Sequence, residues 1–580
     1  MSGEEDQDNR LQVVFCWHMH QPYYKGPKES DFLVPWVYLH GIKDYADMAA
    51  HLEHAPGAKA VVNFAPVLLE QIDDYSKQIQ AWLSRGKLIR DPLLAALAGP
   101  GLPVDTASRK ALLSACLKAN EQHLIGRFKH FSQLVDLAKR VLNNEVLIGY
   151  LNDQCLVDLL VWYHLAWVGE CLRLNDVRIR SLQAKGHNYS SDDRRRMLEM
   201  VEEVLRCLPS RYAKLAKMGR VELSVTPYAH PIIPLMVDIN AAKEASPSIN
   251  MPQLKSYLGG ESRARWHVRK GLEVFEKHFG FRPKGCWPSE GGVSEATLKM
   301  LEEEGFSWTA TGQQVLSNSL MAGGGDSPLP DNWVHSVYRV QEGYLKMFFR
   351  DDGLSDLIGF TYGDWHADDA VGDLINHLVN IADACKGKSD AVVSIIMDGE
   401  NAWEYYPYNG SYFLSAMYEQ LSNHPRLQLA TFSEVLQRQK KPAPRLSKLV
   451  AGSWVYGTFT TWIGDEDKNR AWDMLGEAKK IYDKVLNKKK FTSQQIQELE
   501  KQLAICEGSD WFWWFGDYNP GETVSDFEQL FRCQLSYLFE LLGEPKPDYL
   551  SKVFAFGSGS PVQGGVMKPL IRRIVLFIVC

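Results

Sequence analysis

The segment Leu11–Pro22, LQVVFCWHMHQP, is an apolar run that ends abruptly in polar residues. Short β-rich runs of this kind, bounded by turn residues or helix signals, recur along the chain and predict strands. Near-continuous apolar runs are typical of strands covered on both faces, as in parallel sheets. Seven or eight such strands alternate with helical segments, which indicates an α/β fold, either a barrel or an open sheet. The predicted strands are Leu11–Trp17, Ala60–Phe64, Val221–Thr226, Gly285–Trp287, Phe306–Ala310, Tyr344–Phe349, Ala391–Met397 and Leu427–Thr431.

The segments between the predicted strands are long and helical. Residues 75–218 show no clear strand pattern, and we expect helical insertions there. After about residue 440 the strand pattern stops, and Thr492-x-x-Gln495 is a capping box that opens an amphipathic helix. We therefore expect a barrel-type unit over residues 11–440, a helical bundle over residues 445–550 and a tail over residues 551–580.

Composition and charge limit the class of protein. The 580 residues include 64 basic and 71 acidic side chains, with a net charge of −7. This balance argues against a general nucleic-acid binder, which needs a basic stripe. The acidic N-terminus lacks the features of a signal peptide, and no apolar run reaches the roughly 18 residues of a spanning helix. Ten irregularly spaced cysteines suit reduced thiols, so we expect a cytoplasmic protein with no membrane or nucleic-acid partner.

Polar residues follow the predicted strands at their C-terminal ends, where barrels and open α/β sheets carry their sites. After the first strand come His18, His20 and Gln21, and the two imidazoles point the same way. Such a pair can bind a metal or hydrogen-bond a polar ligand, and the lack of a nearby Asp pair or Cys favours the ligand. The third strand carries Glu222 and leads to His230. Glu222 is either half of a structural ion pair or a residue behind the site.

Glu290 and Asp398 are the strongest catalytic candidates. Glu290 follows the strand that ends at Trp287, and Asp398 ends the run Ala391–Met397. Each can also be a structural carboxylate at a helix start. Paired carboxylates on different strands of one barrel indicate glycoside chemistry, in which one acid is ionised and the other holds a proton. Tryptophan faces suit the C–H faces of pyranose rings. Further candidates for substrate contact are His230, Trp287, Glu400, Trp403, Asp510, Trp511 and Trp513.

Four motifs, in order, resemble those of glycoside hydrolase family 57, in its α-amylase and amylopullulanase-like branch. They are His18-x-His20-Gln21-Pro22, Gly219-Arg220-Val221-Glu222, Trp287-Pro288-Ser289-Glu290 and Asp398-Gly399-Glu400. The resemblance implies an incomplete (β/α)7 barrel followed by a helical bundle that helps to form the cleft. It implies a retaining enzyme for α-glucans such as starch, glycogen or maltooligosaccharides, with Glu290 as nucleophile and Asp398 as general acid/base. It also implies that His18, His20, Glu222, Asp356 and the stretch Trp511–Trp514 lie near the substrate.

Several positions depart from the family pattern. Tyr456 and Thr458 in SWVYGTF stand where relatives carry asparagines, and Tyr518-Asn519 stand where relatives carry an acid and a histidine. These departures affect fine specificity and leave the catalytic pair intact. The tail SPVQGGVMKP resembles the start of a β-rich region that then ends abruptly, so we hypothesise that residues 551–580 are a truncated C-terminal tail.

Other activities remain open at the level of sequence. A 4-α-glucanotransferase or branching enzyme uses the same catalytic pair and passes the sugar to another sugar instead of water. A polysaccharide deacetylase on a related barrel needs a metal-bound water with Asp and His ligands. A non-catalytic glucan-binding protein would bind without turnover. For the retaining hydrolase we expect no cofactor and no metal, and a carboxyl separation of roughly 5–5.5 Å.

Overall fold

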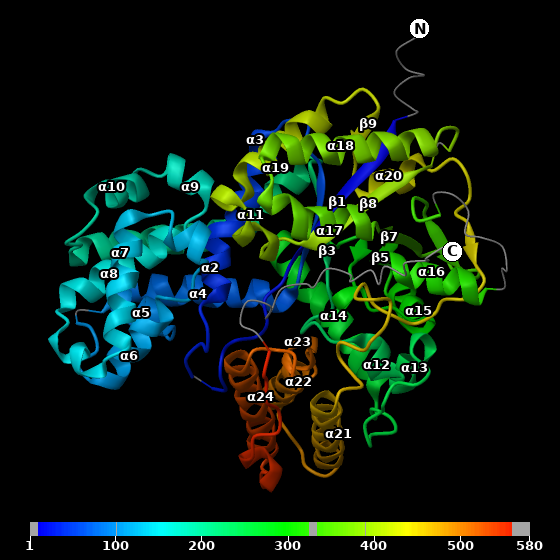
Figure 1. Cartoon of the computed structure of the whole chain (residues 1–580). Helices are drawn as coiled ribbons and strands as arrows, with labels where there is room; N and C mark the ends of the chain where they lie inside the picture. Colours follow the sequence, from blue (N-terminus) through cyan, green and yellow to red (C-terminus); the bar gives the residue numbers. More distant parts are fainter. Residues whose placement is uncertain (1–9, 29, 100, 324–332, 389, 560–580) are drawn as a thin grey trace, which may run out of the picture.

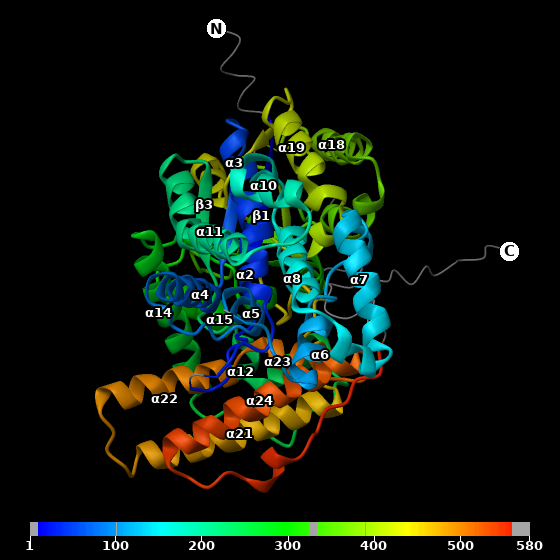
Figure 2. The same cartoon turned by 90° about the vertical axis from the view of Figure 1, so that its left-hand side faces the viewer.

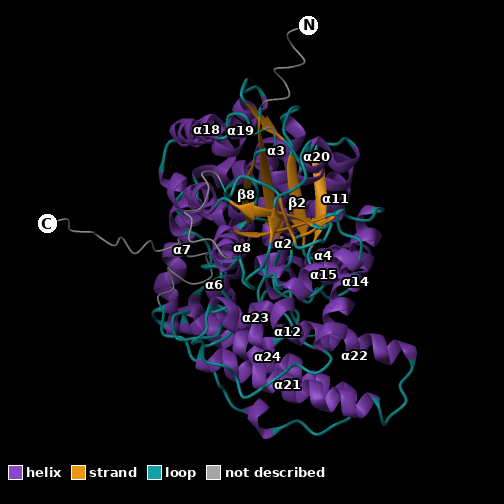
Figure 3. Ribbon diagram, turned by 90° about the vertical axis from the view of Figure 1, so that its right-hand side faces the viewer, coloured by secondary structure: helices purple, strands orange, loops and turns teal. Residues whose placement is uncertain are grey.

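The computed structural model of the chain describes residues 10–28, 30–99, 101–323, 333–388 and 390–559. At its centre lies a parallel sheet that is curled into a seven-stranded barrel and surrounded by helices (Figures 1 and 3). The barrel closes through a single pairing, between Arg350 and Ser394. This confirms the α/β class and the incomplete (β/α)7 barrel. In ring order the strands are β1 (Leu11–Met19), β2 (Ala60–Phe64), β3 (Val221–Val225), β4 (Gly285–Cys286), β5 (Trp308–Gly312), β7 (Lys346–Arg350) and β8 (Val392–Asp398).

Strand β1 is part of the barrel wall and is buried along its whole length. It pairs in parallel with β2 on one side and β8 on the other. The register sets His18 beside Asn63 of β2 and beside Asp398 of β8. Because the carboxyl ends of parallel strands meet at one edge, polar residues from distant parts of the sequence converge there.

Three short strands lie outside the ring. β9 (Leu427–Leu429) pairs with the first residues of β1, β6 (Tyr338–Val340) runs antiparallel to β7, and β10 (Arg445–Leu446) pairs with β6. All eight predicted strands are therefore present. The sequence did not predict β6 and β10, because both are very short and partly exposed and carry no apolar run.

Between β2 and β3 the described residues are helical, as predicted. These helices form the blue and cyan lobe beside the barrel (Figure 1). The longest, α11 (Ser191–Lys217), begins with a capping box between Ser190 and Asp193. The others are α4 (Pro66–Arg85), α5 (Pro92–Ala98), α6 (Thr106–Ala115), η2 (Glu121–Ile125), α7 (Lys129–Leu142), η3 (Glu145–Tyr150), α8 (Asp153–Trp167), α9 (Glu170–Asn175) and α10 (Val177–Lys185).

The remaining helices before residue 440 pack around the barrel. Among them, α18 lies against α19, and α14 packs against β3 and α4. Their bounds are α2 (Trp36–His40), η1 (Gly41–Tyr45), α3 (Ala46–His54), α12 (Ile233–Val237), α13 (Ala242–Ala245), α14 (Gly260–Phe279), α15 (Glu295–Glu303), α16 (Gln313–Ala322), α17 (Asp352–Asp356), α18 (Ala367–Ala384), α19 (Ser411–Ser422) and α20 (Phe432–Arg438).

Four later helices form a bundle at one end of the molecule (Figure 2). They are α21 (Glu466–Leu486), α22 (Ser493–Cys506), α23 (Ser509–Trp514) and α24 (Gly521–Leu542). Thr492 forms the predicted capping box at the start of α22. A fully buried ion pair fastens the bundle to the barrel layer, because Glu507 accepts hydrogen bonds from Arg263 and His267 of α14.

No helix in the described ranges is long and apolar enough to cross a lipid bilayer. The predicted truncated tail spans residues 551–580, of which residues 560–580 lie outside the described residues.

Candidate active site

The carboxyl ends of the barrel strands open into one cleft with a volume of about 620 Å³. Glu290 lies in the short turn η5 (Ser289–Gly291) after β4, and Asp398 is the last residue of β8. Both line this cleft, so the structure brings the two predicted catalytic carboxyl groups together. The predicted site residues that line it are His18, His20, Gln21, Glu290, Asp398, Glu400, Asp510 and Trp513.

The Glu290 carboxyl group is held by Trp454. The indole Nε1 donates a hydrogen bond to Glu290 Oε2 over 3.0 Å, and His230 Nδ1 lies 3.9 Å from Oε1. Burial and the neighbouring Asp398 raise the pKa of Glu290 well above its usual value, whereas the Trp454 hydrogen bond lowers it. Two neighbouring carboxyl groups whose charges repel titrate as a coupled pair. Acid-assisted attack on a glycosidic bond needs such a pair, with one group ionised and the other protonated.

The backbone is strained on both sides of the carboxyl pair. Glu290 and His230 each have a φ of 58°, in the left-handed region that costs a non-glycine residue roughly 1–2 kcal/mol. The Trp454 amide donates to the Glu290 carbonyl oxygen over 3.1 Å and holds that turn in place. Strained residues of this kind cluster at functional sites, where the surrounding structure fixes them.

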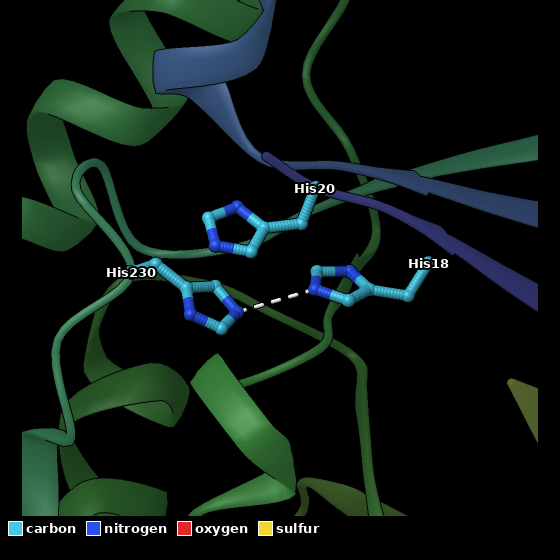
Figure 4. Close-up of side chains that lie close together, drawn as sticks. All are labelled: His18, His20 and His230. Atoms are coloured by element: carbon cyan, nitrogen blue, oxygen red, sulfur yellow. Dashed lines mark hydrogen bonds between the residues drawn. The ribbon is translucent and has the colours of Figure 1, made fainter. Parts of the chain in front are cut away.

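Three histidine rings stack beside the carboxyl pair (Figure 4). His18 Nε2 lies 3.1 Å from His230 Nε2, His18 Nδ1 lies 2.7 Å from Asn63 Oδ1, and His230 Nδ1 lies 2.8 Å from Ser509 Oγ. Burial lowers the pKa of His18 to about 3 and that of His230 well below its usual value, so both rings are neutral near pH 7. A neutral imidazole has one donor and one acceptor nitrogen. Asn63, His18, His230 and Ser509 therefore form a continuous hydrogen-bonded chain from β2 to the bundle, and His20 stacks beside it.

Among the described residues, these three histidines are also a candidate metal site. One ring nitrogen of each lies within 4.8 Å of the other two. The rings of His20 and His230 lie face to face, with centroids 3.8 Å apart and planes 15° apart. The lone pair of an imidazole nitrogen lies in the plane of its ring, so two parallel stacked rings do not converge on one ion. In this conformation the stack suits hydrogen bonding better than coordination.

The bundle and the barrel meet across the cleft at His20, whose Nε2 lies 2.9 Å from Asp510 Oδ1. Beside it, Gln21 Nε2 donates to Glu400 Oε1 over 3.1 Å. Burial and the nearby Asp398 raise the pKa of Glu400 well above its usual value, which favours the protonated form of its carboxyl group. Within the described residues Glu400 Oε2 has no hydrogen-bond partner. Glu400 therefore lines the cleft with one carboxyl oxygen that the protein leaves unpaired.

Glu222 lies away from the cleft, which corrects the expectation of substrate contact. It is the second residue of β3, at the opposite edge of the barrel from the catalytic pair. Its carboxylate accepts hydrogen bonds from Trp308 Nε1 over 2.7 Å and from the amide and hydroxyl of Ser433 over 2.8 and 2.5 Å. A residue early in a parallel strand lies at the amino edge, and here it supports packing between β3, β5 and α20.

Four other predicted contacts lie behind the cleft surface. Trp511 is buried in the bundle against Phe527 and Phe531, because consecutive aromatic residues on a helix point in all directions. Trp403 and Trp287 are also buried, the latter edge-on to Trp454. Asp356 forms an ion pair of 2.7 Å with Arg350. His230 is also buried, but it belongs to the histidine chain through its contact with His18, and it lies close to Glu290.

Sequence reasoning missed several residues of the site. Trp454 lies in SWVYGTF, a stretch in which only Tyr456 and Thr458 drew attention, and no spacing rule connects it to Glu290. Asn63 is the polar residue next to the end of the second predicted strand, and that position is a signal that could have found it. The helical lobe also lines the cleft, through residues 117–120 and Trp167, which the sequence pattern could not place.

Comparison with known proteins gives one family and a consistent fold. The family model of glycosyl hydrolase family 57 matches residues 14–447. No curated protein sequence matches the chain. Three solved structures share the fold at low identity. A branching enzyme from Thermococcus kodakaraensis has 15% identity and a TM-score of 0.55, covering 92% of this chain and 90% of its own.

An α-amylase from Thermotoga maritima has 14% identity and a TM-score of 0.51, covering 93% of this chain and 96% of its own. A 4-α-glucanotransferase from Thermococcus litoralis has 14% identity and a TM-score of 0.51, covering 93% of this chain and 61% of its own. At these identities the likeness shows the fold alone, whereas the family model spans most of the chain, including all four motifs. The chain therefore belongs to glycosyl hydrolase family 57.

Proposed function

We propose that this chain cleaves α-glucans with retention of configuration, through a covalent glycosyl-enzyme. The observation that carries the proposal is the coupled pair Glu290 and Asp398 at the ends of β4 and β8, in one cleft. The fold likeness to an amylase, a branching enzyme and a glucanotransferase supports α-glucan as the substrate class.

In the first step Glu290 attacks the anomeric carbon while Asp398 gives its proton to the departing glycosidic oxygen. A bond forms between Glu290 and the sugar as the glycosidic bond breaks. Asp398, now ionised, takes a proton from water, and the resulting attack on the anomeric carbon releases Glu290. The Trp454 N–H stabilises Glu290 as a carboxylate before the attack and as a leaving group after it.

The histidine chain and Glu400 are positioned to hold the sugar. His18 and His20 line the cleft beside the catalytic pair, and the neutral ring of His18 can donate to or accept from a hydroxyl group. The raised pKa of Glu400 favours a carboxyl group that can donate its proton to a sugar oxygen. Contacts that strengthen as the ring flattens lower the barrier most.

Transfer to a second sugar is the alternative outcome of the same intermediate. The branching enzyme and the glucanotransferase share this fold, and partly exposed aromatic residues of α2 and the bundle (Trp36, Trp513 and Trp514) line the cleft. These rings can stack against an acceptor chain. Hydrolysis or transfer then depends on whether water or sugar reaches the intermediate first.

Incubation with starch, pullulan and maltoheptaose, with products separated by chromatography, tests the proposal. Shorter oligomers indicate hydrolysis, and oligomers longer than maltoheptaose indicate transfer. Proton NMR of the first products should show the α-anomer. A β-anomer as first product, or no turnover of any α-glucan, would contradict the proposal.

The setting of the enzyme follows from composition. The nine described cysteines are all free, which suits a reducing compartment, and we place the protein in the cytoplasm. With a net charge of −7 we expect neither nucleic acid nor a membrane as partner.

A further inference from the structure

The segment after the catalytic Asp398 carries tyrosines out of the cleft onto the surface. It forms the turns η8 (Asn401–Tyr405) and η9 (Pro407–Gly410) before α19. Tyr405 lines the cleft, whereas Tyr408 and Tyr412 lie beyond it, 43% and 63% exposed. We call these three residues the tyrosine platform. Tyr405 lines the cleft, and Tyr408 and Tyr412 follow it closely in the chain, so the platform starts at the cleft and follows one segment away from it.

The two outer rings form a corner. Tyr408 and Tyr412 meet edge to face, with centroids 5.2 Å apart and planes 85° apart. Within the described ranges the hydroxyls of both residues make no hydrogen bond to the protein. Such a corner offers an exposed ring face beside free hydroxyl groups. The C–H face of a pyranose ring packs on the former, and its hydroxyl groups bind the latter.

The outer ring of Tyr408 is held in place by its surroundings. Tyr408 and Asn409 have φ values of 54° and 55°, two consecutive residues in the left-handed region. Asn409 is fixed by the buried Lys43 and Asp47, over 3.1 and 3.2 Å. A backbone conformation of this cost persists only where the surroundings impose it.

Arg127 of the helical lobe supports Tyr408 from one side. The Arg127 guanidinium lies 4.4 Å from the Tyr408 ring centroid and is fixed by two hydrogen bonds to Glu170, of 2.8 and 2.9 Å. A cation on one face leaves the other face for a ligand and restricts the ring to one orientation. A fixed aromatic ring loses little conformational entropy when a ligand binds.

We propose that the tyrosine platform is a second, non-catalytic binding site for α-glucan chains, which holds a polymer while another part of it occupies the cleft. The identity of the ligand rests on the proposed function. A second contact on the same molecule acts through effective concentration, so it favours long chains over short ones. Maltotriose gains little from such a site, and glycogen gains most.

The test compares the full chain with the double variant Tyr408→Ala/Tyr412→Ala in native gels with and without glycogen. Tyr150→Ala is the matched control, because Tyr150 is 84% exposed on the helical lobe and does not line the cleft. We expect the double variant to bind glycogen roughly five-fold or more weakly, and to lose rate on glycogen, while its rate on maltotriose is unchanged. Tyr408→Phe/Tyr412→Phe keeps the rings and should restore most of the binding.

Two results would overturn the platform. One is that glycogen slows the double variant in the gel as much as it slows the wild type. The other is an equal loss of rate on maltotriose and glycogen, which would show that the substitutions act on the cleft or the fold. If the wild type turns over no α-glucan, the proposed function fails, and the gels still decide the platform, because they measure binding without turnover.

Discussion

Replacing Trp454 with phenylalanine should shift the pH dependence of the enzyme. The indole Nε1 donates to Glu290 Oε2 over 3.0 Å and favours the ionised form of that carboxyl group. Attack requires Glu290 as a carboxylate, so the acidic limb of the activity profile reports its pKa. Removing the donor raises the pKa of Glu290 further, and the acidic limb moves to higher pH.

The size of the shift follows from the bond that is lost. A hydrogen bond to a charged group contributes about 1.5–3 kcal/mol, and one pKa unit corresponds to about 1.36 kcal/mol. Trp454→Phe should therefore move the acidic limb upward by roughly one to two pH units. Phenylalanine keeps an aromatic ring against Trp287, so the packing is largely preserved.

The assay is kcat/KM for maltoheptaose as a function of pH. Trp287→Phe is the matched control, because Trp287 is a buried neighbouring indole whose Nε1 has no hydrogen-bond partner among the described residues. It removes the same atoms without touching a carboxylate, so its acidic limb should stay in place. An unmoved limb in Trp454→Phe, or an equal shift in both variants, would refute the reasoning.

Glu290→Gln should lower kcat by at least roughly 10³-fold while the circular dichroism spectrum stays native, since an amide cannot attack; wild-type turnover would exclude Glu290 as nucleophile. Glu400→Gln should raise Tm at pH 8 and leave Tm unchanged at pH 4. The pKa of Glu400 is raised in the folded state, so the wild type loses stability as pH rises above about 4.3, whereas glutamine stays neutral at both pH values. A rise in Tm at pH 4 with none at pH 8 would contradict the raised pKa of Glu400. Glu507→Gln should destabilise the chain by about 3–5 kcal/mol at neutral pH. The pKa of Glu507 is lowered to about 2, so its stabilisation is present above about 4.3 and is lost as pH falls toward 2; a chemical-denaturation midpoint equal to wild type at pH 7 would disprove the buried pair. Glu222→Ala should lower Tm, with a loss of about 2–3 kcal/mol, without changing KM; a raised KM at normal Tm would return Glu222 to the substrate site.

The strand pattern and the two carboxyl positions were readable in the sequence because both are local signals. A strand buried on both faces is a continuous apolar run, and a polar residue at its end marks where the run stops. His18 in β1 and Asp398 in β8 are such residues, so both could be identified from the sequence. The helices also follow local rules, as the capping box at Thr492 shows.

Residues placed by tertiary contact were harder to predict. Trp454 reaches Glu290 across 164 positions of sequence, and no local pattern marks it. Glu222 misled because the resemblance of its motif implied a place near the substrate, although its position at the start of a strand puts it at the amino edge of the barrel. Trp511 misled because an aromatic run does not tell which rings the helix turns inward.

The contact between His20 and Asp510 joins residues 490 positions apart, and this has a consequence during synthesis. At a translation rate of roughly 5–20 residues per second, Asp510 is made roughly 25–100 s after His20. Strand β1 waits nearly as long for β8, so its apolar edge stays unpaired while most of the chain emerges. No nascent fragment that lacks the bundle has a complete cleft, so the chain becomes active only after the bundle has been synthesised. The same interval is the period in which this chain most needs protection from aggregation.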